Sequence, residues 1–260
     1  EMVIRDWSSD VCSSDLNKDA VNKEYVDSLL NNLLNQIVDA DINNGLVAYF
    51  PFLGNAIDIT NNGNDGQVIG AQLCSDKNGN PNSAYEFVRN NGDYIVCSSD
   101  PISPNISFTF SLQIYPKTSL IQYTDSTYNE YIISTGGQTG CPGYFILWNN
   151  GNLTLGRKTT NSYYKVTVNG VNSFEWTNVA LVFDNNIKQL SVYINGKLQK
   201  SINGVEFNNV SNVYRNLYIG VANNYYDLPQ YNLFYNGKID EVRIYNRPLT
   251  SLELLMLNKK

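Results

Sequence analysis

From about residue 42 to the end of the chain, short alternating or β-branched and aromatic runs recur between clusters of Asn, Gly, Asp and Pro. Short runs bounded by turn-forming residues are typical of antiparallel strands. The clearest predicted strands are residues 46–52, 94–97, 108–115, 131–134, 144–148, 153–156, 164–168, 179–183, 189–194, 217–220 and 237–245. The pattern predicts an all-β domain over residues 42–260, built as a two-sheet antiparallel sandwich or jelly roll.

One hairpin is predicted with its turn. The dipeptide Asn195-Gly196 separates the apolar run 190–194 from residues 197–201. A two-residue type I′ turn needs positive φ at both central positions, which Asn and Gly tolerate best. Residues 190–194 and 197–201 should therefore pair antiparallel.

A short helix is predicted at the C-terminus. The sequence Thr250-Ser251-Leu252-Glu253 has the spacing of a capping box. Leu252, Leu255 and Met256 then share one helical face, which we expect to close one end of the sandwich.

A second helix is predicted before the β domain, over residues 17–41. Its apolar positions follow a 4-3-4-3 spacing, which is a heptad seam, and Leu29 and Leu34 widen the apolar face. The seam residues are Val26, Leu30, Leu33, Ile37 and Ala40. The wider face favours a coiled-coil homotrimer over a dimer, while a helix packed on its own domain is the alternative.

Residues 1–16 (EMVIRDWSSDVCSSDL) show no periodicity, and no apolar segment follows a basic start as in a signal peptide. We expect them to be a non-native or artefactual leader.

Composition removes several function classes. The formal net charge is −6 and the chain has no His. Without a basic run, neither nucleic acid nor an anionic membrane is an expected partner, and without His the imidazole-dependent triads are unavailable. Apolar runs such as 179–183 are far shorter than the ~20 residues that a membrane span requires, so no membrane insertion is expected.

The four cysteines lack metal-site spacing. Cys12, Cys74, Cys97 and Cys141 lie far apart in the sequence, which argues against zinc and thioredoxin-type sites. Buried or incidental thiols are one interpretation. The other is a disulfide between Cys74 and Cys97, which lie in neighbouring predicted strands and could pair in an oxidising compartment.

The start of the predicted stalk resembles a known segment. Residues 19–27 (DAVNKEYVD) are similar to the DAVNKxYVD segment of phage tail-fibre and tail-spike proteins. In that family the segment precedes C-terminal receptor-binding domains on trimeric shafts. The resemblance implies a virion or another extracellular location.

The β domain as a whole resembles the concanavalin A-like, laminin G-like jelly-roll family. The matching segments keep the family's order and spacing: 45–52 (GLVAYFPF), 63–66 (GNDG), 80–87 (NPNSAYEF), 176–183 (WTNVALVF), 193–197 (YINGK) and 237–249 (GKIDEVRIYNRPL). The resemblance implies two antiparallel sheets with a concave and a convex side. It leaves the ligand open, because members bind sugars, proteins or other polymers and some are structural.

Catalysis is not expected. The glucanase branch of this family resembles ExDxE on one strand, and the chain has no such triplet. Asp240 and Glu241 are adjacent, so regular strand alternation would point them to opposite faces.

A structural calcium ion is a candidate cofactor. Asp58, Asn64 and Asp240 offer hard oxygen ligands near the first and last strands, which this fold brings side by side. Ordinary Asx turns beside glycines are the alternative.

Carbohydrate binding rests on the density of aromatic and amide side chains, which suit the apolar faces and hydroxyls of sugars. Three smaller clusters are Tyr123, Tyr128, Asn129 and Tyr131; Trp148, Asn149, Asn150 and Asn152; and Tyr163 and Tyr164. We favour the long loop before the last strand, with Asn223, Asn224, Tyr225, Tyr226, Asp227, Tyr231 and Tyr235. Trp176 is expected in the core.

The sequence therefore predicts a non-catalytic adhesion module that recognises a cell-surface glycan or glycoprotein. A structural domain that caps a fibre, or a polysaccharide-degrading enzyme, is the alternative.

Overall fold

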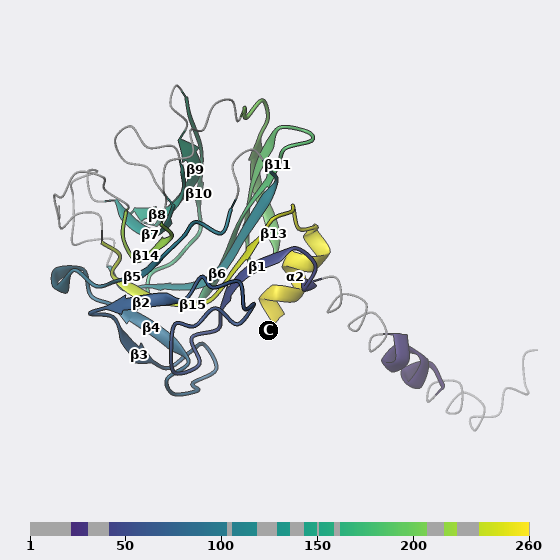
Figure 1. Ribbon diagram of the computed structural model, residues 1–260. Coiled ribbons are helices and arrows are strands. Elements are labelled where there is room, and N and C mark those ends of the chain that lie inside the picture. The colour runs from purple at the N-terminus through teal and green to yellow at the C-terminus, as the bar shows by residue number, and fades with distance from the viewer. Residues whose placement is uncertain are drawn as a thin grey trace, which may run out of the picture. The chain divides into compact units, whose positions relative to one another are not determined.

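The computed structural model divides into two compact units, residues 1–44 and 45–260. It describes residues 22–30, 42–102, 106–118, 129–135, 143–149, 151–158, 162–206, 216–222 and 234–259 (Figure 1). In the first unit, residues 22–30 are helical, within the predicted stalk. The predicted leader 1–16 and the remainder of the seam lie outside the described residues.

One sheet, here called sheet A, contains eight of the described strands. Their order is β13-β12-β11-β6-β15-β4-β3, and β1 also pairs with β15. The strands are β1 (Leu46–Phe50), β3 (Gln72–Cys74), β4 (Ala84–Phe87), β6 (Phe108–Pro116), β11 (Thr177–Asp184), β12 (Gln189–Ile194), β13 (Lys197–Ile202) and β15 (Gly237–Tyr245). All the pairings are antiparallel, with β1 and β4 sharing one edge of β15.

The opposing sheet, sheet B, contains seven described strands in the order β10-β9-β8-β7-β14-β5-β2 (Figure 1). They are β2 (Gly66–Ile69), β5 (Tyr94–Cys97), β7 (Glu130–Ser134), β8 (Gly143–Asn149), β9 (Asn152–Lys158), β10 (Tyr163–Asn169) and β14 (Tyr218–Ile219). The fold is thus the predicted antiparallel jelly-roll sandwich, and its strands agree with the predicted runs to within a few residues. Strands β2, β3 and β4 were not among those runs.

The core forms where the inward side chains of the two sheets meet. Phe108 of β6 contacts Tyr144 of β8 across the sandwich, with ring centroids 4.2 Å apart. Trp148 of β8 is also fully buried in this core. The prediction that Trp148 belongs to a binding cluster is therefore wrong, because its position on β8 faces inward. Trp176, predicted to lie in the core, is only half-buried and contacts Tyr115.

The β12–β13 hairpin turns as predicted. Asn195 and Gly196 have φ of 50° and 72°, so both occupy the region that a type I′ turn requires. A Cβ at Gly196 would lie 2.6 Å from the Cα of Leu255, which shows how closely the C-terminal helix approaches the turn.

The C-terminal helix α2 (Ser251–Lys259) begins with the predicted capping box. Glu253 accepts hydrogen bonds from the backbone N–H and the hydroxyl of Thr250, at 2.6 and 2.8 Å. The predicted buried face is wrong, since Leu254 and Leu257 are buried while Leu252 and Leu255 are exposed. The helix carries apolar side chains on more than one side, so periodicity alone does not identify the packed face.

The two cysteines in the described strands carry free thiols. Cys74 lies on β3 of sheet A and Cys97 on β5 of sheet B. The two strands do not form one hairpin, so the disulfide considered above is absent from the structure. Burial raises the pKa of Cys97 to about 12.

Candidate functional site

The structure tests little of the predicted binding loop. Its members Asn223, Asn224, Tyr225, Tyr226, Asp227 and Tyr231 lie outside the described residues. Tyr235 is described and is fully buried, with its ring 6.4 Å from that of Phe87. Including Tyr235 in a binding surface was wrong, because the chain has already entered the core at the approach to β15. Burial raises its pKa well above the usual value.

The predicted calcium ligands do not form a cation site as they are placed. Asp58 accepts hydrogen bonds from the backbone N–H groups of Tyr49 and Thr60, and Asn64 Nδ2 donates to its second oxygen at 2.8 Å. Burial opposes ionisation, but these bonds hold the pKa of Asp58 below its usual value. An amide donor thus occupies a place where calcium needs an oxygen.

Asp240, the third predicted ligand, accepts a bond from the backbone N–H of Glu241 at 2.7 Å. Among the described residues, no group of three or more His, Cys, Asp or Glu side chains could hold a metal ion. No comparison tests calcium binding, which stays a prediction.

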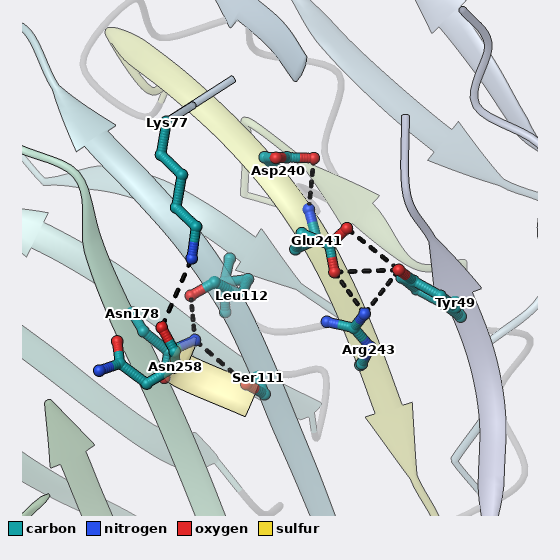
Figure 2. Close-up of polar contacts among 9 residues, drawn as sticks. All are labelled: Tyr49, Lys77, Ser111, Leu112, Asn178, Asp240, Glu241, Arg243 and Asn258. Carbon is teal, nitrogen blue, oxygen red and sulfur yellow. Dashed lines mark hydrogen bonds and ion pairs between the residues drawn. The ribbon is translucent and has the colours of Figure 1, made fainter. Parts of the chain in front are cut away.

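A β-bulge in β15 overturns the alternation argument for Asp240 and Glu241. Asp240 pairs with Gln113 and Arg243 with Ser111, so β15 has one extra residue at this point. Glu241 has φ of 55°, and its carboxylate forms an ion pair with Arg243 and accepts a bond from the Tyr49 hydroxyl (Figure 2). The expectation of opposite faces was wrong, because a bulge interrupts the two-residue period.

The environment of Asp240 opposes its ionisation. Burial, and next the carboxylate of Glu241, raise its pKa to about 7. Arg243 acts in the other direction but is committed to Glu241, and its guanidinium lies 4.0 Å from the centroid of the Tyr49 ring. Asp240 is 4% exposed, which leaves it little contact with an outside ligand.

The second candidate is an aromatic surface on the face of sheet B that points away from sheet A. In β8, Tyr144, Ile146 and Trp148 enter the main core. Alternation turns Phe145 and Leu147 the other way, where they form a separate cluster with Tyr131 and Ala222. Sequence reasoning missed Phe145, because an apolar run shows alternation without showing which neighbours it joins.

Three rings from three strands form what we call the aromatic platform: Tyr131, Phe145 and Tyr163. The rings of Phe145 and Tyr163 are stacked, with centroids 5.4 Å apart and planes 9° from parallel. Tyr131 lies on the other side of Phe145, at 6.0 Å. The two tyrosines belong to different clusters in the sequence, and the structure joins them through Phe145. Tyr163 remains 49% exposed, whereas Phe145 and Tyr131 are buried.

A glycine makes this stacking possible. Gly156 of β9 pairs with Lys165 of β10 on one side and with Phe145 of β8 on the other. A Cβ at Gly156 would lie 2.8 Å from Phe145 Cζ and 2.4 Å from the carbonyl oxygen of Tyr164. The absence of a side chain therefore lets the Phe145 ring lie over β9.

Polar groups border the platform. Thr154 and Thr167 face each other on β9 and β10 with their hydroxyl oxygens 2.9 Å apart, and the ammonium of Lys165 lies over the Tyr163 ring at 5.7 Å. Burial, and next Tyr131, raise the pKa of Tyr163 to about 12, so its hydroxyl stays neutral at physiological pH. An exposed ring beside an ammonium can stack on an apolar ligand face and bind a polar group next to it.

A second ring group lies on β5 and β14 of sheet B. The Tyr94 ring lies 6.3 Å from that of Tyr218 and 6.4 Å from that of Phe234. Tyr94 and Tyr218 are partly exposed. Sequence reasoning did not group these residues, because they lie in three distant segments.

The chain belongs to the concanavalin A-like lectin/glucanases superfamily, whose laminin G-like family model matches residues 89–254. None of the curated proteins matches the sequence.

Solved structures share the fold at low sequence identity. The binding domain of Paraclostridial Mosquitocidal Protein 1 is 18% identical, with a TM-score of 0.67, over 84% of this chain and 52% of that one. The binding domain of botulinum neurotoxin serotype D is 17% identical, with a TM-score of 0.63, over 85% and 52%. The chain spans about half the length of these toxin domains.

Domain 4 of the extracellular arabinanase AbnA from Geobacillus stearothermophilus, solved in complex with arabinotriose, is matched over almost its whole length. It is 21% identical, with a TM-score of 0.60, over 82% of this chain and 98% of that domain. These likenesses establish the fold. In the described part of the chain, no helix has the length and apolar character to cross a membrane.

Proposed function

We propose that this chain is a non-catalytic carbohydrate-binding module that uses the aromatic platform of sheet B to bind a cell-surface glycan or glycoprotein. The observation that carries the proposal is the Tyr163 ring, which is half-exposed and backed by the buried ring of Phe145. A backed ring keeps its orientation, so a sugar that stacks on it meets a preorganised surface. The arabinotriose complex of the arabinanase domain supports the ligand class by analogy.

The proposed context is the C-terminal receptor-binding domain of a phage tail fibre or extracellular adhesin. The segment 19–27, the superfamily and the toxin binding domains support it. A homotrimeric stalk over residues 17–41 would present three platforms together, so weak sites would act through avidity. A structural cap on the fibre is the alternative.

A polysaccharide-degrading enzyme is supported less well. Asp240, whose pKa is raised to about 7, lies beside the carboxyl group of Glu241, and glycosidases use two neighbouring carboxyl groups. However, Asp240 is almost fully buried and Glu241 is bonded to Arg243 and Tyr49. If the protein released reducing sugars from a polysaccharide and Asp240→Asn abolished the release, the result would favour an enzymatic function.

Substitution of the platform ring tests the proposal. Tyr163→Ala should lower affinity for the best ligand on a glycan array by about fivefold or more, because one stacked ring contributes roughly 1 kcal/mol or more. Phe174→Ala is the matched control, since Phe174 is 54% exposed and contacts one ring, that of Tyr115. Equal binding by wild-type and Tyr163→Ala protein would remove the platform from the site.

A further inference from the structure

The charges on sheet B differ from those of the whole chain. The chain has 24 acidic and 18 basic residues. In the described strands of sheet B, however, the only carboxylate belongs to Glu130. Glu130 is 2% exposed and forms an ion pair with Arg89, so it presents no free negative charge.

Among the described side chains on the strands of sheet B, the exposed charge is positive and adjoins the platform. Lys165 of β10 is exposed, while Arg157 of β9 is fully buried between the sheets. Lys165 pairs with Gly156, the residue over which Phe145 lies. Because the described strands of sheet B place no exposed carboxylate beside it, the Lys165 ammonium can attract an anionic ligand.

The position of Lys165 distinguishes between ligands. Its ammonium lies over the Tyr163 ring, on which a sugar would stack. A neutral sugar displaces the ammonium and loses the cation–π contact, which contributes roughly 0.5–1 kcal/mol at exposed sites. A sugar with a carboxylate replaces that contact by an ion pair and a charge-assisted hydrogen bond.

We infer that the platform selects acidic saccharides, with Tyr163 stacking on the sugar ring and Lys165 binding its carboxylate. This inference rests on the proposed function, because it assigns a ligand class to the same surface. The carboxylate can come from a sialic acid or from a uronic acid, which present the same group.

Matched ligand pairs on the full chain test the inference. The probes are sialyllactose beside lactose, and oligogalacturonate beside its methyl ester. Wild-type protein should bind at least one acidic member about tenfold more tightly than its neutral partner, and the preference should fall as salt rises from 50 to 500 mM. Which pair shows the preference identifies the source of the carboxylate.

Variants separate this inference from the proposed function. Lys165→Gln should remove most of the preference, whereas Lys165→Arg should keep it. Lys188→Gln, which removes an exposed ammonium from the turn between β11 and β12 of sheet A, is the control. If wild-type protein binds acidic and neutral ligands equally, and Tyr163→Ala weakens that binding, the acidic selectivity is overturned and the proposed function stands. Binding that Tyr163→Ala leaves unchanged would overturn both.

Discussion

The ring of Tyr163 on β10 lies parallel to that of Phe145 on β8, although a whole strand, β9, runs between their backbones. The contact exists because the intervening residue is Gly156, whose missing side chain leaves room for Phe145. The exposed ring is thus supported by a buried ring, and the buried ring is positioned by a glycine. Binding at this surface should depend on all three residues.

Gly156→Ala tests that dependence. The new Cβ would meet the Tyr164 carbonyl oxygen and Phe145 Cζ at distances below 3.0 Å, and the backbone atom cannot move cheaply. We expect a loss of about 1–3 kcal/mol in the free energy of unfolding, as overpacking typically causes, together with weaker glycan binding. Urea denaturation and the array measure the two effects. Thr154→Ala, on the same strand and face, should cost much less; an unchanged stability for Gly156→Ala would contradict the account of the platform.

Local pattern was enough to predict the sandwich. Strand-forming runs recur between turn-forming residues, and the Asn195-Gly196 turn fixes the pairing of β12 with β13 without reference to the rest of the chain. The platform could not be predicted in this way. Tyr131, Phe145 and Tyr163 come together only through the order of β7, β8, β9 and β10 in sheet B. Strand order is a tertiary property, so the sequence showed two tyrosine clusters without their connection.

The errors have local causes. Asp240 and Glu241 were assigned to opposite faces because a regular strand alternates, but the bulge at this position breaks the period. The face of α2 was misassigned because Leu residues lie on more than one side of the helix. In both cases the sequence pattern allows more than one orientation of the side chains, and tertiary packing determines which one forms.

Removing one partner of the buried ion pair between Arg89 and Glu130 should strongly destabilise the fold. Both side chains are buried, and Glu130 also accepts bonds from the Thr118 hydroxyl and the Asn236 backbone N–H. Arg89→Met leaves the carboxylate buried without its cation and should cost about 3–5 kcal/mol.

A double-mutant cycle by chemical denaturation measures that coupling. Adding Glu130→Gln to Arg89→Met should restore part of the loss, because the uncompensated charge is gone. Lys117→Met breaks a half-exposed pair with Glu86 and should cost less than about 1 kcal/mol. If Arg89→Met and Lys117→Met lowered the free energy of unfolding equally, burial of the Arg89 pair would not increase the effect of breaking it.

Calcium dependence is open to a direct test. Asp58 and Asn64 already bond to each other, and Ser99 donates to Asn64 Oδ1 at 3.1 Å. Because these hydrogen bonds already occupy oxygen atoms that calcium would need, we expect the melting temperature to be the same in calcium and in chelator. A melting temperature that is higher in calcium than in chelator would contradict that expectation. If Asp58→Asn abolished the difference, the result would support the predicted calcium site.

The free energy of unfolding should depend on pH through the titration of Asp240. Its folded pKa of about 7 exceeds the usual 3.8, so the folded state binds the proton more tightly than the unfolded state. This contribution is therefore fully present below pH 4 and is lost as pH rises to about 7, by up to roughly 4 kcal/mol.

Asp240→Asn should remove that slope. The stability of the variant relative to wild type should increase between pH 4 and 7 and stay constant above, as measured by urea denaturation at each pH. The exposed Glu175→Gln is the control and should follow wild type. Parallel pH profiles for wild type and Asp240→Asn would mean that Asp240 titrates normally.

The exposed side of the stalk helix predicts self-association. In the helix 22–30, Val26 and Leu30 of the predicted seam and their neighbour Leu29 are each about half-exposed. An isolated helix with an uncovered apolar face is marginal in water, and three copies cover a wide face better than two. Sedimentation equilibrium should therefore give a trimer for the full chain and a monomer for residues 42–260. Leu30→Asp should dissociate the trimer, because it buries a charge in the seam, whereas Ser28→Asp, outside the seam, should not. A monomeric full chain would remove the basis for avidity, and binding would then depend on the strength of a single platform.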